Sequence, residues 1–183
     1  TVNASGMSDL KLTTLSSKIA NIDSITSLTI TLAQSATEIG NLLTKSVDAL
    51  VIATDMAYSG TAGDQLNAVA AGTTGIAANG IRGSVSVSTS LTSENLGAFL
   101  GKCSVLASPA DSTVTVDATG MTASFDVLAA NIAAVDTINN LSLTSAQSAA
   151  TITALLTKSV DAVANATSMN PARLTALGGG ASG

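Results

Sequence analysis

The sequence has few charged residues and almost no aromatic ones. Charged residues make up 10% of the 183 residues and aromatic residues 2%, whereas about 25% of an ordinary soluble domain is charged. Alanine, serine, threonine, leucine and glycine dominate the remainder. A core of this composition packs small aliphatic side chains closely and repeatedly, without large aromatic rings at its centre.

Histidine is absent, and cysteine occurs only once. Structural zinc sites are usually built from cysteine and histidine, and Ser-His-Asp or Cys-His nucleophile arrangements need a histidine. We therefore predict a protein that is not an enzyme, with no catalytic residue and no cofactor. The single cysteine, Cys103, has no partner in the chain for a disulfide. It is expected to be a buried small hydrophobe, with an intermolecular crosslink as the alternative.

Neither nucleic acid nor a membrane is expected as a partner. The seven lysine and arginine residues are not clustered, and the formal net charge is -5, so the chain lacks the basic patch that phosphate backbones attract. Residues 137–157 carry no charge, but about half of them are polar, which argues against a membrane span. The chain begins at Thr1 without a basic and then apolar leader, as expected of a processed mature protein or of a fragment.

Internal repetition is the strongest signal in the sequence. Residues 1–7 (TVNASGM) recur as residues 115–121 (TVDATGM), and residues 42–49 recur without change as residues 155–162 (LLTKSVDA). A fixed internal period of this kind is typical of repeat architectures. An Ala-[Ser/Thr]-x-Met motif occurs four times and ends at Met7, Met56, Met121 and Met169. A lysine occupies an equivalent position in each of the three longer copies, at Lys45, Lys102 and Lys158.

The first half of each copy begins with the short Ala-[Ser/Thr]-x-Met stretch, which we interpret as β-prone. A helix is predicted after it, because apolar residues then recur at helical spacing. These residues are Leu12, Leu15, Ile19 and Ile22 in one copy and Phe125, Leu128, Ile132 and Val135 in another.

The second half begins with an alternation of apolar and polar residues, Leu28, Ile30 and Leu32 with threonines between them. This period of two predicts a strand with one buried face. A second helix is predicted after it, beginning at serine or threonine N-caps. Its apolar residues are Ile39, Leu42 and Leu43, then Leu96, Phe99 and Leu100, then Ile152, Leu155 and Leu156.

These patterns predict an α/β solenoid of about seven strand-helix turns with roughly 25 residues per turn. Parallel strands would stack along one wall and helices along the other. Strands are expected to begin near Val2, Leu28, Val51, Val85, Val114, Leu141 and Val163. The solenoid would form a single domain over residues 1–177, with copies at about 1–50, 51–113 and 114–162 and a partial copy at 163–177. Residues 178–183 would form a flexible glycine-rich tail.

Single acidic residues lie near the corners of the predicted repeats, and secreted repeat proteins often bind calcium at such corners. A calcium ion takes six to eight oxygen ligands, which isolated carboxylates do not supply without backbone carbonyls. Calcium is therefore the alternative here, and solvated side chains are the favoured interpretation. The residues concerned are Asp48, Asp55, Asp117 and Asp161.

The sequence of residues 116–121 (VDATGM) and 141–149 (LSLTSAQSA) resembles the Ala/Ser/Thr-rich tandem repeats of large secreted bacterial surface proteins, including S-layer-like and hemolysin-like proteins. The resemblance extends over nearly the whole chain and is compositional. It implies a secreted or cell-surface protein without enzymatic activity, and it assigns no functional residue.

We therefore predict a structural subunit of an extracellular filament, appendage or surface layer that assembles with other copies of itself. The first and last turns lack polar caps, so they are expected to stack head to tail. The alternative is an adhesin-type or other ligand-binding module of a larger secreted protein. The predicted self-assembly interface consists of Val2, Asn3, Ala4, Ser5 and Met7 at one end and Val163, Asn165, Thr167 and Met169 at the other.

Overall fold

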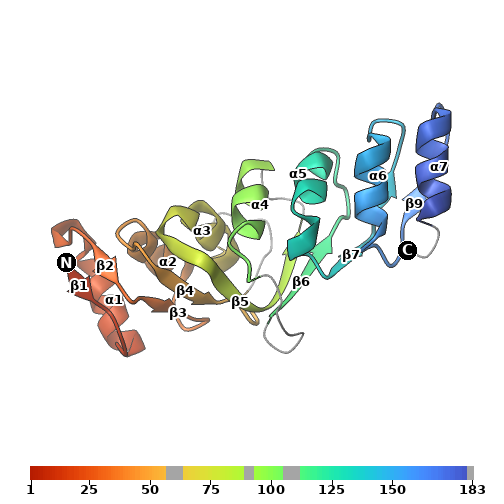
Figure 1. Ribbon diagram of the computed structural model, residues 1–183. Helices are drawn as coiled ribbons and strands as arrows, with labels where there is room; N and C mark the ends of the chain where they lie inside the picture. Colours follow the sequence, from red (N-terminus) through yellow and green to blue (C-terminus); the bar gives the residue numbers. More distant parts are fainter. Residues whose placement is uncertain (57–63, 89–92, 105–111, 181–183) are drawn as a thin grey trace. The chain divides into compact units, whose positions relative to one another are not determined.

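The computed structural model describes residues 1–56, 64–88, 93–104 and 112–180. Over these residues the chain is α/β, with seven α-helices and a parallel five-stranded sheet in the order β3-β4-β5-β6-β7 (Figure 1). Two further parallel strand pairs are β1 with β2 and β8 with β9. The predicted α/β class with parallel strands is therefore confirmed.

Most strands are short. A helix follows each single strand, or each two strands that are consecutive in the sequence (β2 with β3, and β7 with β8). The strands are β1 (Val2–Asn3), β2 (Ile25–Thr26), β3 (Thr29–Ile30), β4 (Ala49–Ile52), β5 (Ile76–Ser88), β6 (Ser112–Asp117), β7 (Thr137–Asn139), β8 (Ser142–Leu143) and β9 (Val163–Ala164). The helices are α1 (Asp9–Ser17), α2 (Ala36–Leu43), α3 (Gln65–Ala71), α4 (Ser93–Leu100), α5 (Phe125–Ala130), α6 (Ala149–Leu156) and α7 (Pro171–Gly179). Parallel pairing of neighbouring strands requires such crossovers.

The chain divides into two compact units. Unit 1 contains Thr1–Val85 and Ala98–Thr113, and unit 2 contains Ser86–Gly97 and Val114–Gly183. In unit 1, α1 packs on α2 and α2 packs on α3. In unit 2, α5, α6 and α7 pack side by side in that order (Figure 1). Each unit thus repeats the same arrangement, in which a strand of one turn pairs with a strand of the next and the helices of neighbouring turns pack.

The Ala-[Ser/Thr]-x-Met motif forms a turn, which corrects its interpretation as a β-prone stretch. β1 ends at Asn3, before the motif. In each copy the methionine N–H donates to the carbonyl of the motif's alanine, as from Met7 to Ala4 at 3.1 Å. The residue before the methionine has a positive φ, and it is Gly6 in the first copy and Ser168 in the last. Strict spacing of this motif therefore reflects turn geometry.

A left-handed residue also divides the second-half strands. Ser27 lies between β2 and β3 with a φ of 55°, and its counterpart Asn140 lies between β7 and β8 with the same φ. The Ser27 N–H donates to Asp48 Oδ1 at 2.7 Å, and the Asn140 N–H donates to Asp161 Oδ1 in the same way. An aspartate of the following turn therefore holds each break in place.

The predicted apolar faces of the second-half helices form the core. All nine residues predicted for these faces are at most 6% exposed. Leu28 and Ile30 are also buried, but Leu32 is 49% exposed, because β3 ends at Ile30 and the chain then turns away from the strand direction. The predicted alternation is thus correct for two of its three apolar positions.

The last helix continues beyond the expected end of the repeat domain. α7 runs to Gly179, and Gly180 is its C-cap. A Cβ on Gly180 would overlap Leu156, just as a Cβ on Gly72 at the end of α3 would overlap Leu43. Residues 178–180 therefore belong to the packed turn and are not part of a flexible tail.

Substitution of Leu155 by aspartate tests the packing of α6 against the strands. Leu155 is fully buried, and a buried charge without a partner costs several kcal/mol. We expect the melting temperature of Leu155→Asp to fall by on the order of 10 °C. Leu42→Asp should behave in the same way, because Leu42 is the equivalent buried position. Thr153→Asp, at an exposed position of the same helix, is the control, and equal melting of all three variants would contradict this packing.

One buried position carries either serine or cysteine. Ser46, Cys103 and Ser159 form equivalent parallel bridges to Ile25, Ile81 and Ile138. The hydroxyl oxygens of Ser46 and Ser159 are buried and have no hydrogen-bond partner among the described residues. Cys103 is 1% exposed, so the prediction that it is buried is confirmed.

Replacement of Ser159 by alanine should stabilise the protein, because a buried hydroxyl without a partner costs about 1–3 kcal/mol. We expect thermal denaturation of Ser159→Ala about 2–4 °C above that of the parent chain. Ser148→Ala is the matched control, since Ser148 caps α6 by accepting from the Thr151 N–H at 3.1 Å. Loss of this N-cap hydrogen bond should lower the melting temperature. A lower melting temperature for Ser159→Ala would show that the hydroxyl has a stabilising partner.

Candidate functional site

The first and last strands each have one open edge. In the described part of the chain, β1 pairs only with β2 and β9 pairs only with β8. The N–H groups of Val2 and Ala4 donate to the carbonyls of Ser24, just before β2, and Thr26, in β2, at 2.8 and 2.9 Å. Because backbone groups alternate between the two edges of a strand, the N–H and C=O of Asn3 point to the open edge.

The same alternation exposes the outer edge of β9. The N–H groups of Val163 and Asn165 donate to Leu141 and Leu143, both at 2.8 Å. Ala164 lies between them, and its N–H and C=O therefore point away from β8. No charged residue or proline occurs in residues 1–7 or 163–169 to block these edges. Unblocked strand edges are templates for pairing with another chain.

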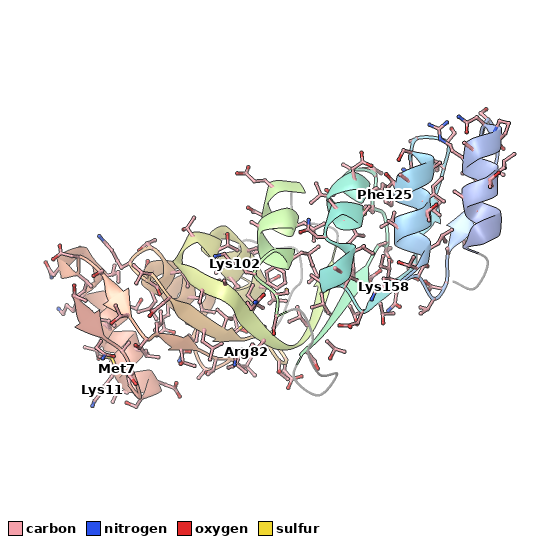
Figure 2. The ribbon with its side chains drawn as sticks, in the orientation of Figure 1. Met7, Lys11, Arg82, Lys102, Phe125 and Lys158 are labelled. Carbon is pink, nitrogen blue, oxygen red and sulfur yellow. The ribbon has the colours of Figure 1, made fainter. Side chains whose placement is uncertain are left out.

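An apolar face flanks the open edge of β1. Leu10 on α1 is 77% exposed, and Met7 and Leu15 are half-buried. These three residues line a depression of about 400 Å³, whose rim carries Lys11 and Lys18. Figure 2 shows Met7 and Lys11 close together at this end of unit 1.

A second apolar face lies beside β9. Val163 is 70% exposed and Leu174 on α7 is 46% exposed, and Ala164 and Ala166 are also exposed. Most of their counterparts in the second copy are buried: Leu66, the counterpart of Leu174, is 1% exposed, although Leu50, the counterpart of Val163, is half-buried. Val51 and Ala53, the counterparts of Ala164 and Ala166, are at most 1% exposed. The last turn thus presents to solvent positions that the interior of the repeat covers.

Some of the residues predicted for the self-assembly interface are accessible to solvent, and others are buried. Asn3, Ser5, Val163, Asn165 and Thr167 are exposed, and Val2 and Met7 are half-buried. Ala4 and Met169 are buried within their own turns, at 3% and 8% exposure, and cannot contribute contact surface. Leu10 and Leu174 belong to these faces although the prediction omitted them.

The open ends are internally ordered by short polar contacts. The Ser5 N–H donates to Asn3 Oδ1 at 2.9 Å, and the Thr167 N–H donates to Asn165 Oδ1 at 3.0 Å. These asparagines therefore fix the turn that follows each strand. Their side chains serve the fold of the end turns, whereas the apolar side chains provide the free surface.

Three of the aspartates considered for calcium, Asp48, Asp117 and Asp161, accept hydrogen bonds from neighbouring backbone or side-chain groups. Asp48 and Asp161 accept from the left-handed turn residues described above. Among the described residues, no three acidic, cysteine or histidine side chains come together as metal ligands. These residues therefore form no metal site by themselves. None of the described helices is long and apolar enough to cross a membrane.

Asp117 joins two consecutive turns of unit 2. Its Oδ1 accepts from the Thr119 hydroxyl at 2.7 Å, from Asn140 Nδ2 at 3.0 Å and from the Thr119 N–H at 3.0 Å. Hydrogen bonds from the Thr119 hydroxyl, the Asn140 amide and the Thr119 N–H hold the pKa of Asp117 below its ordinary value of 3.8. All of these donors favour the ionised carboxylate.

Stability should therefore depend on pH through Asp117. A lowered pKa in the folded state means that this contribution is present above the ordinary pKa and is lost as the pH falls through the folded pKa. We expect the difference in melting temperature between the parent chain and Asp117→Asn to be largest near neutral pH and to shrink below pH 3.8. A difference that is independent of pH would contradict the role of the ionised carboxylate.

Comparison with family models, curated proteins and solved structures gave no match for this chain. The resemblance to the tandem repeats of bacterial surface proteins stays a prediction.

Proposed function

We propose that the chain is a structural subunit of an extracellular filament, appendage or surface layer, and that it has no enzymatic activity. In this proposal the seven strand-helix turns form a solenoid, and copies of the chain assemble head to tail through β1–α1 and β9–α7. The observation that carries it is the exposure of Ala164, Ala166 and Leu174 at positions whose counterparts in the second copy are buried.

A second copy of the chain is the favoured occupant of these faces. Inside each unit, neighbouring strand-helix turns cover one another, as α2 packs on α3 and α6 packs on α7. A surface shaped to receive a strand-helix turn is therefore best covered by the end turn of another molecule. Burial of one exposed leucine contributes about 1.5–3 kcal/mol, so Leu10 and Leu174 provide part of the energy of the joint.

Backbone pairing would supply direction and register. The outward N–H and C=O groups of Asn3 and Ala164 can extend the parallel ladder from one molecule into the next, as in strand addition. Pairing of unlike ends is heterologous, and such a contact propagates into a filament unless it closes into a ring.

Two end-blocking variants test the proposal. Leu10→Asp blocks the face beside β1, and Leu174→Asp blocks the face beside β9. Each variant alone should remain monomeric in analytical ultracentrifugation, because one partner of every joint then carries an unpaired charge. An equimolar mixture should form dimers and nothing larger, since only one combination of intact faces remains.

Thr153→Asp is the matched control, because it adds the same charge at an exposed position outside both faces. This variant should assemble like the parent chain, which should form filaments or lattices in negative-stain micrographs. Parent chains that stay dispersed as monomers at all concentrations would overturn self-assembly and favour the ligand-binding alternative. Dimers formed by either variant alone would show that like faces pair.

A further inference from the structure

Two buried glutamines occupy equivalent positions in the two units. Gln34 is 2% exposed and Gln147 is 7% exposed, and each lies in the loop before a second-half helix. Gln34 Oε1 accepts from the Thr31 N–H at 2.8 Å, and Gln147 Oε1 accepts from the Thr144 N–H at 2.7 Å. The side-chain oxygen is therefore used in the same way in both loops. The amide nitrogen of each glutamine can then donate to a group outside its own loop.

The amide nitrogen of Gln34 has an acceptor within the chain. Gln34 Nε2 donates to Asp9 Oδ1 at 2.8 Å, and Asp9 is the first residue of α1. When α1 and α5 are aligned at their C-caps, Lys18 and Asn131, the position of Asp9 corresponds to Thr122. α5 begins only at Phe125, after the left-handed Ser124, and is thus shorter than α1 by one turn. The helical turn that carries the carboxylate is therefore missing above Gln147.

Two adjoining depressions, of about 310 and 440 Å³, occupy this place. Both are lined by Thr122, Phe125, Ala146 and Gln147. Gln147 Nε2 donates no hydrogen bond within the described part of the chain, and it is not among the buried atoms that lack a partner. The nitrogen is therefore reachable from the depressions. Their volumes lie in the range of small-molecule sites, about 300–1,000 Å³.

The loop that carries Gln147 is held in place from its other side. Arg173 on α7 donates through Nε to the Gln147 carbonyl at 2.6 Å. In the first unit, Gln65 donates to the Gln34 carbonyl at the same distance of 2.6 Å. The donor at Gln147 is thus preorganised, which lowers the entropic cost of binding a ligand.

The lining favours a neutral ligand that carries hydroxyl groups. Asp126 provides a carboxylate, whose Oδ1 already accepts from the Thr151 hydroxyl at 2.6 Å. Among the described lining residues there is no lysine or arginine, so an anion would meet Asp126 without a compensating cation. Phe125 and Met121 add apolar wall (Figure 2 shows Phe125 on α5). An amide donor, a carboxylate, several serine and threonine hydroxyls and an apolar wall suit a molecule with both hydroxyl and C–H surfaces.

We propose that the depressions beside Gln147 bind a neutral sugar of monosaccharide size. Gln147 Nε2 donates to one ring hydroxyl, and the Asp126 carboxylate accepts from another. This proposal is independent of self-assembly, because its residues do not belong to the end faces defined by Leu10 and Leu174.

The test follows the side-chain amide signals of glutamine in an ¹⁵N-labelled full chain during titration with glucose, galactose or N-acetylglucosamine. At least one of these sugars should shift the Gln147 amide signals in a saturable way. The Gln34 amide signals should stay in place, since Asp9 already occupies that donor. Sodium acetate is the anionic probe and should not shift the Gln147 signals.

Two variants complete the test. Thr122→Asp adds a carboxylate to the lining of both depressions, where it competes with a sugar for the Gln147 amide. It should weaken sugar binding at least about tenfold, which is a difference of 1.4 kcal/mol. Gln147→Glu replaces the donor by an acceptor and should weaken binding to a similar extent, with folding checked by thermal denaturation. Absence of a saturable shift with all three sugars, a shift with acetate alone, or unchanged binding by folded variants would overturn the proposal.

Discussion

The fold depends on the burial of one apolar helix face behind each strand or strand pair. Several strands contain only two residues, and so short a ladder has little stability of its own. The second-half helices α2 and α6 that follow such strands bury leucine and isoleucine at full depth, as at Ile39 and Leu42. Glycines at the helix ends allow this approach: a side chain at Gly72 or Gly180 would overlap a leucine of the neighbouring helix. A composition rich in small residues is thus a condition of this packing.

Repetition made much of the fold predictable, because each weak local pattern occurs more than once. The buried faces of α2, α4 and α6 and the strand positions near Val2 and Val163 followed from aligned copies. The exposure of Leu32 and the turn at Ala4 could not be predicted in this way. Both depend on where backbone hydrogen bonding stops, and the apolar pattern carries no information about that point.

The candidate sites lie where equivalent positions differ in their surroundings. Leu66 and Leu174 are the same repeat position, yet Leu66 is 1% exposed and Leu174 is 46% exposed. Gln34 and Gln147 likewise share their loop geometry and differ only in the acceptor offered to the amide nitrogen. Sequence comparison between copies showed the shared residues, whereas the loss of one helical turn before Phe125 became evident only from the backbone.

The order of the half-repeats has a consequence for any assembly of this chain. The described turns alternate between the two kinds, and both β1–α1 and β9–α7 are of the first kind. A head-to-tail joint therefore brings two turns of the same kind together, and the alternation changes phase at every subunit boundary. Such a joint differs chemically from every interface inside a molecule. In the proposed assembly, this unlike contact would therefore occur once per subunit. Its spacing along the assembly would equal the length of one subunit.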